Sequence, residues 1–150
     1  MIKKKTILSR YEIAIVRAFA GAIQSVHQQY KLDMCDFLLK AFDTEIFNNF
    51  ENEHCIYTQG YHCIAGKLLE EIEKQGKTVS ELGDIDMTDA DAPTAYWLGY
   101  LFMYWKLSRK PDSNVFKKYD LKEIYWDYDV LHTTDIDYAI DSIIDKGNQD

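Results

Sequence analysis

Apolar residues recur at steps of three and four along most of the chain, the spacing that gathers them on one face of an α-helix. The first such stretch covers residues 8–30, and Ser9 with Glu12 three residues later forms a capping box at its start. Another covers residues 61–75 and is followed by Gly76, a residue type that often ends helices. We therefore predict two long helices in the first half of the chain.

Shorter helices are expected between these two. Asp33 can cap a helix that carries Phe37, and Asp43 or Thr44 can cap a helix that carries Phe47. Each candidate cap comes directly before an apolar run, as the start of a helix requires. The first half should therefore fold as a long helix, two short helices and a closing helix.

The second half repeats this type of pattern after an acidic segment. Before that segment, Thr78 begins a further capping box, which predicts a short helical turn around Leu82. Thr94 can cap a helix over residues 95–107, and Asp120 can cap one over residues 121–128.

A final amphipathic helix closes the chain. Thr134 and Asp137 frame it, and Ile140 lies on its inner face. The helical spacing predicts a core that includes Phe19, Ile23, Leu68, Ile72, Trp97, Leu101, Ile140 and Ile144.

No segment shows the sustained alternation of a half-buried strand, so the predicted fold is all-α, a compact helical bundle forming a single domain over residues 1–150. Similar residues recur at offsets of 77 to 79 positions. This recurrence suggests two duplicated helical units, residues 8–76 and 94–146, joined by an acidic loop over residues 83–93. Chance similarity between helices of like length is the alternative.

Composition supports a folded domain. The chain has 150 residues, of which 47% are hydrophobic, so disordered and collagen-like proteins are excluded. The 25 acidic residues exceed the 17 basic ones and give a net charge of −8, which argues against a general nucleic-acid binder.

Three scattered cysteines do not form a disulfide framework and favour a reducing compartment. The basic start of the chain imitates a signal peptide, but Glu12 and Arg17 interrupt the stretch that would have to be apolar. No run approaches the length of a membrane span. We expect a cytoplasmic protein that does not enter a membrane.

Candidate metal ligands are present in unsuitable patterns. The pairs His54-Cys55 and His62-Cys63 lie eight residues apart, whereas zinc ligands usually lie two to four residues apart. The acidic segment that begins at Asp84 has no glycine at the sixth position of an EF-hand loop. We expect neither a metal nor another cofactor.

Two further functions stay open as alternatives. His132 could serve a small enzyme or a ligand-binding protein with a helical pocket, although a histidine near a helix entrance usually bonds to its neighbours. The segment after Thr78 could belong to a helix-turn-helix regulator, but Glu81 and Asp84 would repel phosphate there.

The helix over residues 95–107 carries more large rings than one buried stripe can hold. The spacing places Trp97 and Tyr100 on one face and Tyr96 on another, so some rings meet a partner or a second part of the protein. Tyrosine and tryptophan are favoured anchors at protein interfaces. The predicted partner-binding residues are Tyr96, Trp97, Tyr100, Trp105, Tyr125, Trp126 and His132.

Two segments of the second half carry a resemblance: Ala95-Tyr96-Trp97-Leu98-Gly99-Tyr100, and Tyr128-Asp129-Val130-Leu131-His132-Thr133-Thr134. Together they resemble a family of small bacterial proteins with a Tyr…Leu-His-Thr signature near the C-terminal helix. Members are found beside genes for ADP-ribosyltransferase-like toxins, so the resemblance implies a non-enzymatic, antitoxin-like companion that binds such a toxin. The first half has no His-Thr element before Tyr61, which argues against two equivalent sites.

Overall fold

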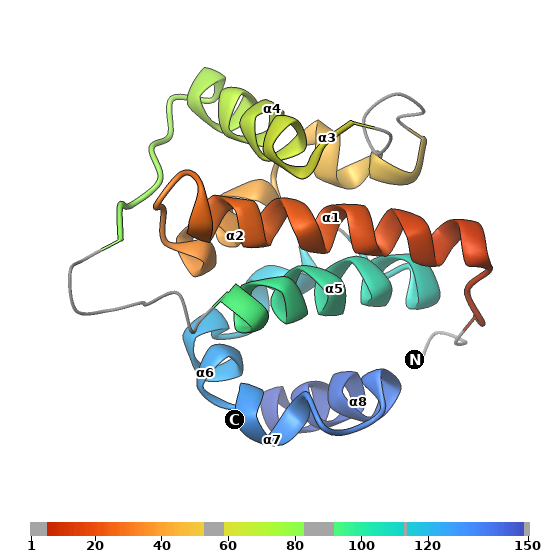
Figure 1. Ribbon diagram of the computed structural model, residues 1–150. Helices are drawn as coiled ribbons and strands as arrows, with labels where there is room; N and C mark the ends of the chain where they lie inside the picture. Colours follow the sequence, from red (N-terminus) through yellow and green to blue (C-terminus); the bar gives the residue numbers. More distant parts are fainter. Residues whose placement is uncertain (1–5, 53–58, 83–91, 113, 149–150) are drawn as a thin grey trace.

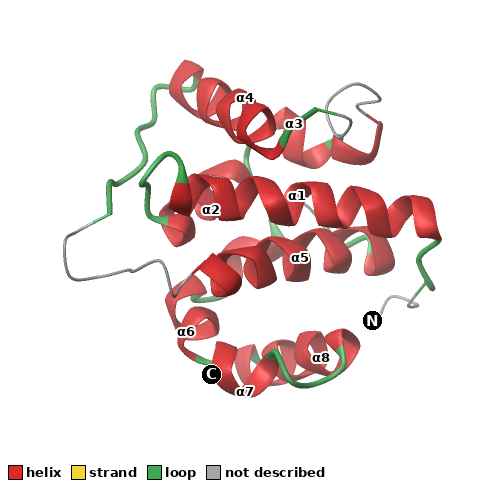
Figure 2. Cartoon of the chain, viewed as in Figure 1, coloured by secondary structure: helices red, strands yellow, loops and turns green. Residues whose placement is uncertain are grey.

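The computed structural model describes residues 6–52, 59–82, 92–112 and 114–148. These residues form helices and contain no strand (Figure 1), and Figure 2 shows only helices and loops among them. The predicted all-α bundle is therefore confirmed. The elements are α1 (Arg10–Gln28), α2 (Met34–Ala41), α3 (Glu45–Asn48), η1 (Phe50–Asn52), α4 (Tyr61–Lys74), α5 (Ala92–Arg109), η3 (Val115–Lys118), α6 (Leu121–Trp126), α7 (Tyr128–Leu131) and α8 (Ile136–Gly147).

Helices α1 and α5 lie side by side at the centre and run in opposite directions (Figure 1). The backbone N–H of Thr6, just before α1, donates to the carbonyl of Ser108 near the end of α5. The two helices approach closely at Gly99, where a Cβ atom would lie 2.9 Å from the Cα atom of Ala20. A side chain at this position would push the central pair apart.

The remaining long helices cover this pair from opposite sides. Helix α4 packs on α1, and α8 packs on α5, which gives the order α4, α1, α5, α8 in Figure 1. Each half of the chain therefore contains a long helix, short helices and a closing helix. The duplication of residues 8–76 and 94–146 stays a prediction.

An aromatic cluster joins the two halves in the core. The ring of Phe42 lies 5.1 Å from that of Phe102 and 5.3 Å from that of Phe116. The ring of Trp105 lies 5.1 Å from that of Phe116. Six predicted core residues are fully buried, namely Phe19, Ile23, Leu68, Ile72, Leu101 and Ile140. The other two, Trp97 and Ile144, are half-buried against the core.

Most helix starts follow their predicted caps. The Ser9 hydroxyl accepts from the N–H of Glu12, and the Glu12 carboxylate accepts from the N–H of Ser9. Asp33, Thr44 and Asp120 cap α2, α3 and α6 through their side-chain oxygens. These bonds satisfy backbone donors that have no partner inside the helix, which explains why local sequence identifies them.

Two helix boundaries differ from the prediction. Helix α5 begins at Ala92 rather than after Thr94, because Pro93 suits a first turn in which a backbone N–H is not needed. The predicted helix over residues 121–128 is broken at Asp127 into α6 and α7. The cap of α8 is Asp135, whose carboxylate accepts from the N–H two residues later.

The predicted helical turn around Leu82 is wrong. Residues 77–82 are not helical, and the N–H of Leu82 donates to the carbonyl of Lys31. The N–H of Asp33 in turn donates to the carbonyl of Ser80. These long-range backbone bonds hold the segment against the loop before α2 and replace the local bonds of a helix.

Candidate partner-binding groove

An open groove lies where α7 meets the outer side of α5, next to the C-terminal half of α1. Its volume is about 480 Å³. The groove is lined by Gln24, Pro93, Tyr96, Trp97, Tyr100, Tyr128 and His132. Four of the seven predicted partner-binding residues therefore meet at one place, namely Tyr96, Trp97, Tyr100 and His132.

Regular helical spacing brings these rings together. Tyr96 and Tyr100 are four residues apart on α5, and their ring centroids lie 6.4 Å apart. On α7, His132 stacks on Tyr128 with centroids 4.2 Å apart and ring planes 13° apart. Residues four positions apart lie one above the other on a helix, so each helix contributes a short aromatic ladder.

Trp97 of α5 contacts the second ladder. Its ring is nearly perpendicular to that of Tyr128, with centroids 5.5 Å apart and an interplanar angle of 71°. Edge-to-face contact of this kind is a favourable arrangement for aromatic pairs. The contact fixes α7 against α5 and leaves ring surface of both ladders lining the groove.

His132 is exposed, follows the last residue of α7, and has one ring nitrogen engaged. Its Nδ1 lies 2.6 Å from the carbonyl oxygen of Tyr128. Because a carbonyl oxygen only accepts, Nδ1 carries the proton and donates it. The bond agrees with the prediction that this histidine bonds to a neighbour, but it lies at the end of a helix rather than at an entrance.

Charges differ at the two ends of the tyrosine ladder on α5. Burial raises the pKa of Tyr104, and the carboxylates of Asp137 and Asp135 add to the rise. Burial also raises the pKa of Tyr96, where Tyr61 adds to the rise and Arg17 opposes it. The end near Tyr104 therefore holds two carboxylates beside the buried Arg109, which opposes their effect, and the end near Tyr96 holds Arg17.

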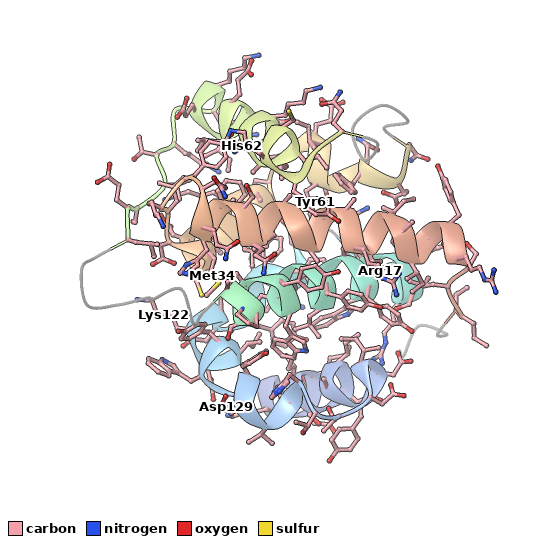
Figure 3. The ribbon with its side chains drawn as sticks, viewed as in Figure 1. Arg17, Met34, Tyr61, His62, Lys122 and Asp129 are labelled. Carbon is pink, nitrogen blue, oxygen red and sulfur yellow. The ribbon has the colours of Figure 1, made fainter. Side chains whose placement is uncertain are left out.

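Negative charge is concentrated in the last part of the chain. Residues 120–150 hold nine acidic residues against two lysines, so they carry −7 of the net charge of −8. Helices α7 and α8 belong to this part, and Figure 3 shows Asp129 on α7. The groove therefore lies beside a strongly acidic part of the sequence.

The other three predicted site residues lie elsewhere. The prediction for Trp105 is wrong, because its indole is only 2% exposed and packs in the aromatic core. Tyr125 and Trp126 pack against each other on α6, with centroids 5.2 Å apart, and neither lines the groove. Trp126 is 74% exposed, so it presents a separate surface.

Three lining residues were not predicted. Tyr128 lies four residues before His132, so helical spacing could have indicated it. Gln24 comes from α1 and donates from its side chain to the carbonyl of Ala92. Nothing local in the sequence indicates that Gln24 or Pro93 reaches this groove.

The cysteines give no metal site within the described ranges, where no group of three histidine, cysteine or carboxylate side chains could hold an ion. Cys35 is buried, and burial raises the pKa of its thiol to about 12, so it does not form a ready thiolate. Cys63 is exposed on α4. His54, Cys55 and the acidic segment from Asp84 lie outside the described residues.

The regulator alternative loses part of its basis, because the segment after Gly76 is not helical as far as residue 82. In the part of the chain that the structure describes, no helix is both long and apolar enough to cross a bilayer.

Comparison of the chain with protein-family models, with curated proteins and with solved structures finds no match.

Proposed function

We propose that this chain is a non-enzymatic protein-binding module whose partner docks in the groove between α5 and α7. The observation that carries the proposal is the convergence of Trp97, Tyr100, Tyr128 and His132 at one open groove. Half-buried aromatic side chains already held by packing lose little entropy when a partner covers them. Such residues are the usual anchors of protein interfaces.

The surrounding charge supports a basic partner. A strongly acidic region steers positively charged proteins toward it and raises the rate of association. The family resemblance adds a specific candidate, an ADP-ribosyltransferase-like toxin encoded by a neighbouring gene. We therefore propose that the chain acts as an antitoxin-like companion of such a protein, in the cytoplasm, where an odd number of cysteines is ordinary.

Binding of a small molecule around His132 is the second candidate. The groove volume of about 480 Å³ falls within the range of ligand sites, roughly 300–1,000 Å³. Against this candidate, the groove is open, whereas ligand sites usually enclose most of their ligand. Native mass spectrometry of the purified protein distinguishes the two, because a tightly held ligand would add its mass to that of the chain.

The test compares groove variants with matched variants elsewhere. The product of the neighbouring gene is titrated by calorimetry into the wild type, Tyr96→Ala and Tyr100→Ala. Tyr138→Ala serves as the control, because this tyrosine is 62% exposed on α8 and does not line the groove. Circular dichroism checks that every variant is folded.

Loss of an interface anchor should weaken binding about tenfold or more, which corresponds to at least about 1.4 kcal/mol. The control should bind like the wild type. The proposal is wrong if both groove variants keep wild-type affinity. Trp126→Ala completes the set, and a loss of binding confined to this variant would place the interface on α6.

A further inference from the structure

We propose that the groove takes an arginine side chain of the partner protein, an inference that rests on the proposed function. Two features lead to it: planar rings in two orientations that line the groove, and carboxylates near Tyr104, the ring that stacks on Tyr100 beside the groove. Together they match a cation that is itself planar. Arginine has such a head group, because its guanidinium is flat, always charged and able to stack on aromatic faces.

The ring geometry supplies the first part of the recognition. The Trp97 and Tyr128 rings lie at 71° to each other, so they present two walls of a corner rather than one flat plate. The face of an aromatic ring is electronegative and attracts a cation within about 6 Å of its centre. His132 already covers one face of the Tyr128 ring, with centroids 4.2 Å apart. A guanidinium stacked on the ring surface that remains in this corner therefore meets the second ring at its side.

Charge near the groove supplies the second part of the recognition and favours one side for the incoming guanidinium. Tyr100 stacks on Tyr104 at 6.0 Å, and the carboxylates of Asp135 and Asp137 act on Tyr104. Arg17 acts on Tyr96, at the opposite end of the same ladder. Arg109 also acts on Tyr104 and opposes the two carboxylates there, but it is paired with Asp137. The carboxylate of Asp135 therefore attracts an incoming cation toward the α8 side of Tyr100, and Arg17 repels it from Tyr96.

Not every carboxylate near α8 is available to a partner. Arg109 is buried, and it donates to the side chains of Asp137 and Asp141 at 3.3 and 2.7 Å. Asp135 uses one oxygen to cap α8 and is exposed. Replacing Asp135 therefore tests whether negative charge attracts the guanidinium, and it does so without breaking a buried ion pair.

The experiment uses two synthetic peptides that differ by one charge. Both have the sequence glycine–serine–X–serine–glycine with blocked ends, where X is arginine in one and citrulline in the other. Citrulline has nearly the shape of arginine but is neutral. Each peptide is titrated into the full-length, nitrogen-15-labelled protein, and the indole N–H signal of Trp97 is followed by NMR.

The arginine peptide should shift the Trp97 signal in a saturable way and bind several-fold more tightly than the citrulline peptide. Tyr128→Leu and Asp135→Asn should each weaken this binding several-fold. Asparagine caps helices about as well as aspartate, so the second variant leaves α8 intact. Glu73 is exposed on α4, on the far side of α1 from the groove. Glu73→Gln removes the same charge as Asp135→Asn and should not change binding of the arginine peptide.

Equal shifts from the two peptides, or no shift from either, would overturn the inference. If the partner protein still loses affinity for the groove variants in that case, the proposed function stands without it. If the groove variants weaken binding of the arginine peptide but leave binding of the partner protein unchanged, the inference and the proposed function are both wrong, because the partner then docks elsewhere.

Discussion

Replacing Trp105 by alanine should destabilise the fold strongly, whereas replacing Trp126 should not. The Trp105 indole is 2% exposed, and its ring lies 5.1 Å from that of Phe116 and 5.3 Å from that of Tyr119. Truncation of a buried tryptophan to alanine typically costs about 3–5 kcal/mol, because apolar contacts are lost and a cavity remains. That cost is a large fraction of the roughly 5–15 kcal/mol that stabilises an ordinary domain.

Urea denaturation followed by far-ultraviolet circular dichroism measures the free energy of unfolding of both variants. A loss of about 3–5 kcal/mol in a domain of this size lowers the melting temperature by roughly 6–20 °C. Trp126 is 74% exposed, so its replacement should change the free energy of unfolding by no more than about 0.5 kcal/mol. If Trp105→Ala costs less than about 1 kcal/mol, the indole does not occupy the core and the assignment of the two faces of α5 is wrong.

Two further measurements test the packing of the central helices and a surface ion cluster. Gly99→Ala should lower the free energy of unfolding by up to about 2 kcal/mol. Overpacking against Ala20 costs about 1–3 kcal/mol, whereas the higher helix propensity of alanine returns about 1 kcal/mol. If urea denaturation instead shows a free energy of unfolding higher by about 1 kcal/mol, the two helices do not touch there. The hydrogen bond from Lys117 lowers the pKa of Asp43 in the folded state, and Lys77 contributes to the same shift. Since the unfolded chain binds the proton more readily, this carboxylate stabilises the fold above its unfolded pKa of about 3.9, and the benefit is lost as the pH falls below that value. Asp43→Asn should therefore be less stable than the wild type at pH 7, and the difference should shrink as the pH falls below about 3.9 toward the lowered pKa of the folded state. A constant difference from pH 7 to the acid end of the titration would contradict the assignment.

Local signals in the sequence were sufficient for most of the fold. The caps at Ser9, Asp33 and Asp120 were predictable because each depends on a bond between residues two or three positions apart. The same type of signal failed at Thr78. There the backbone of residues 80–82 pairs with the loop before α2, about 50 positions away along the chain. Such pairing depends on tertiary position, which a local motif does not contain.

The groove was only partly predictable for the same reason. Tyr96, Tyr100 and His132 were indicated by the excess of rings and by the family resemblance. The contribution of Gln24 depends on how α1 crosses α5, and that crossing is set by close packing at Gly99. Trp105 was named as a partner-binding residue although it is buried, because α5 is aromatic on several sides and periodicity alone could not separate its core face from its outer face.

Helix α5 has no single apolar face, and this feature connects the fold with the proposed function. A helix that packs on one side can bury all its rings in one stripe, but α5 packs on α1, on the aromatic core and on the C-terminal helices. Helix α7 contacts the outer side of α5 at Trp97, while Tyr96 and Tyr100 are half-exposed and line the groove. The central position of α5 thus accounts for the buried rings, and its incomplete cover accounts for the groove. Substitutions at the groove should therefore change binding while the core that holds α5 in place keeps its stability.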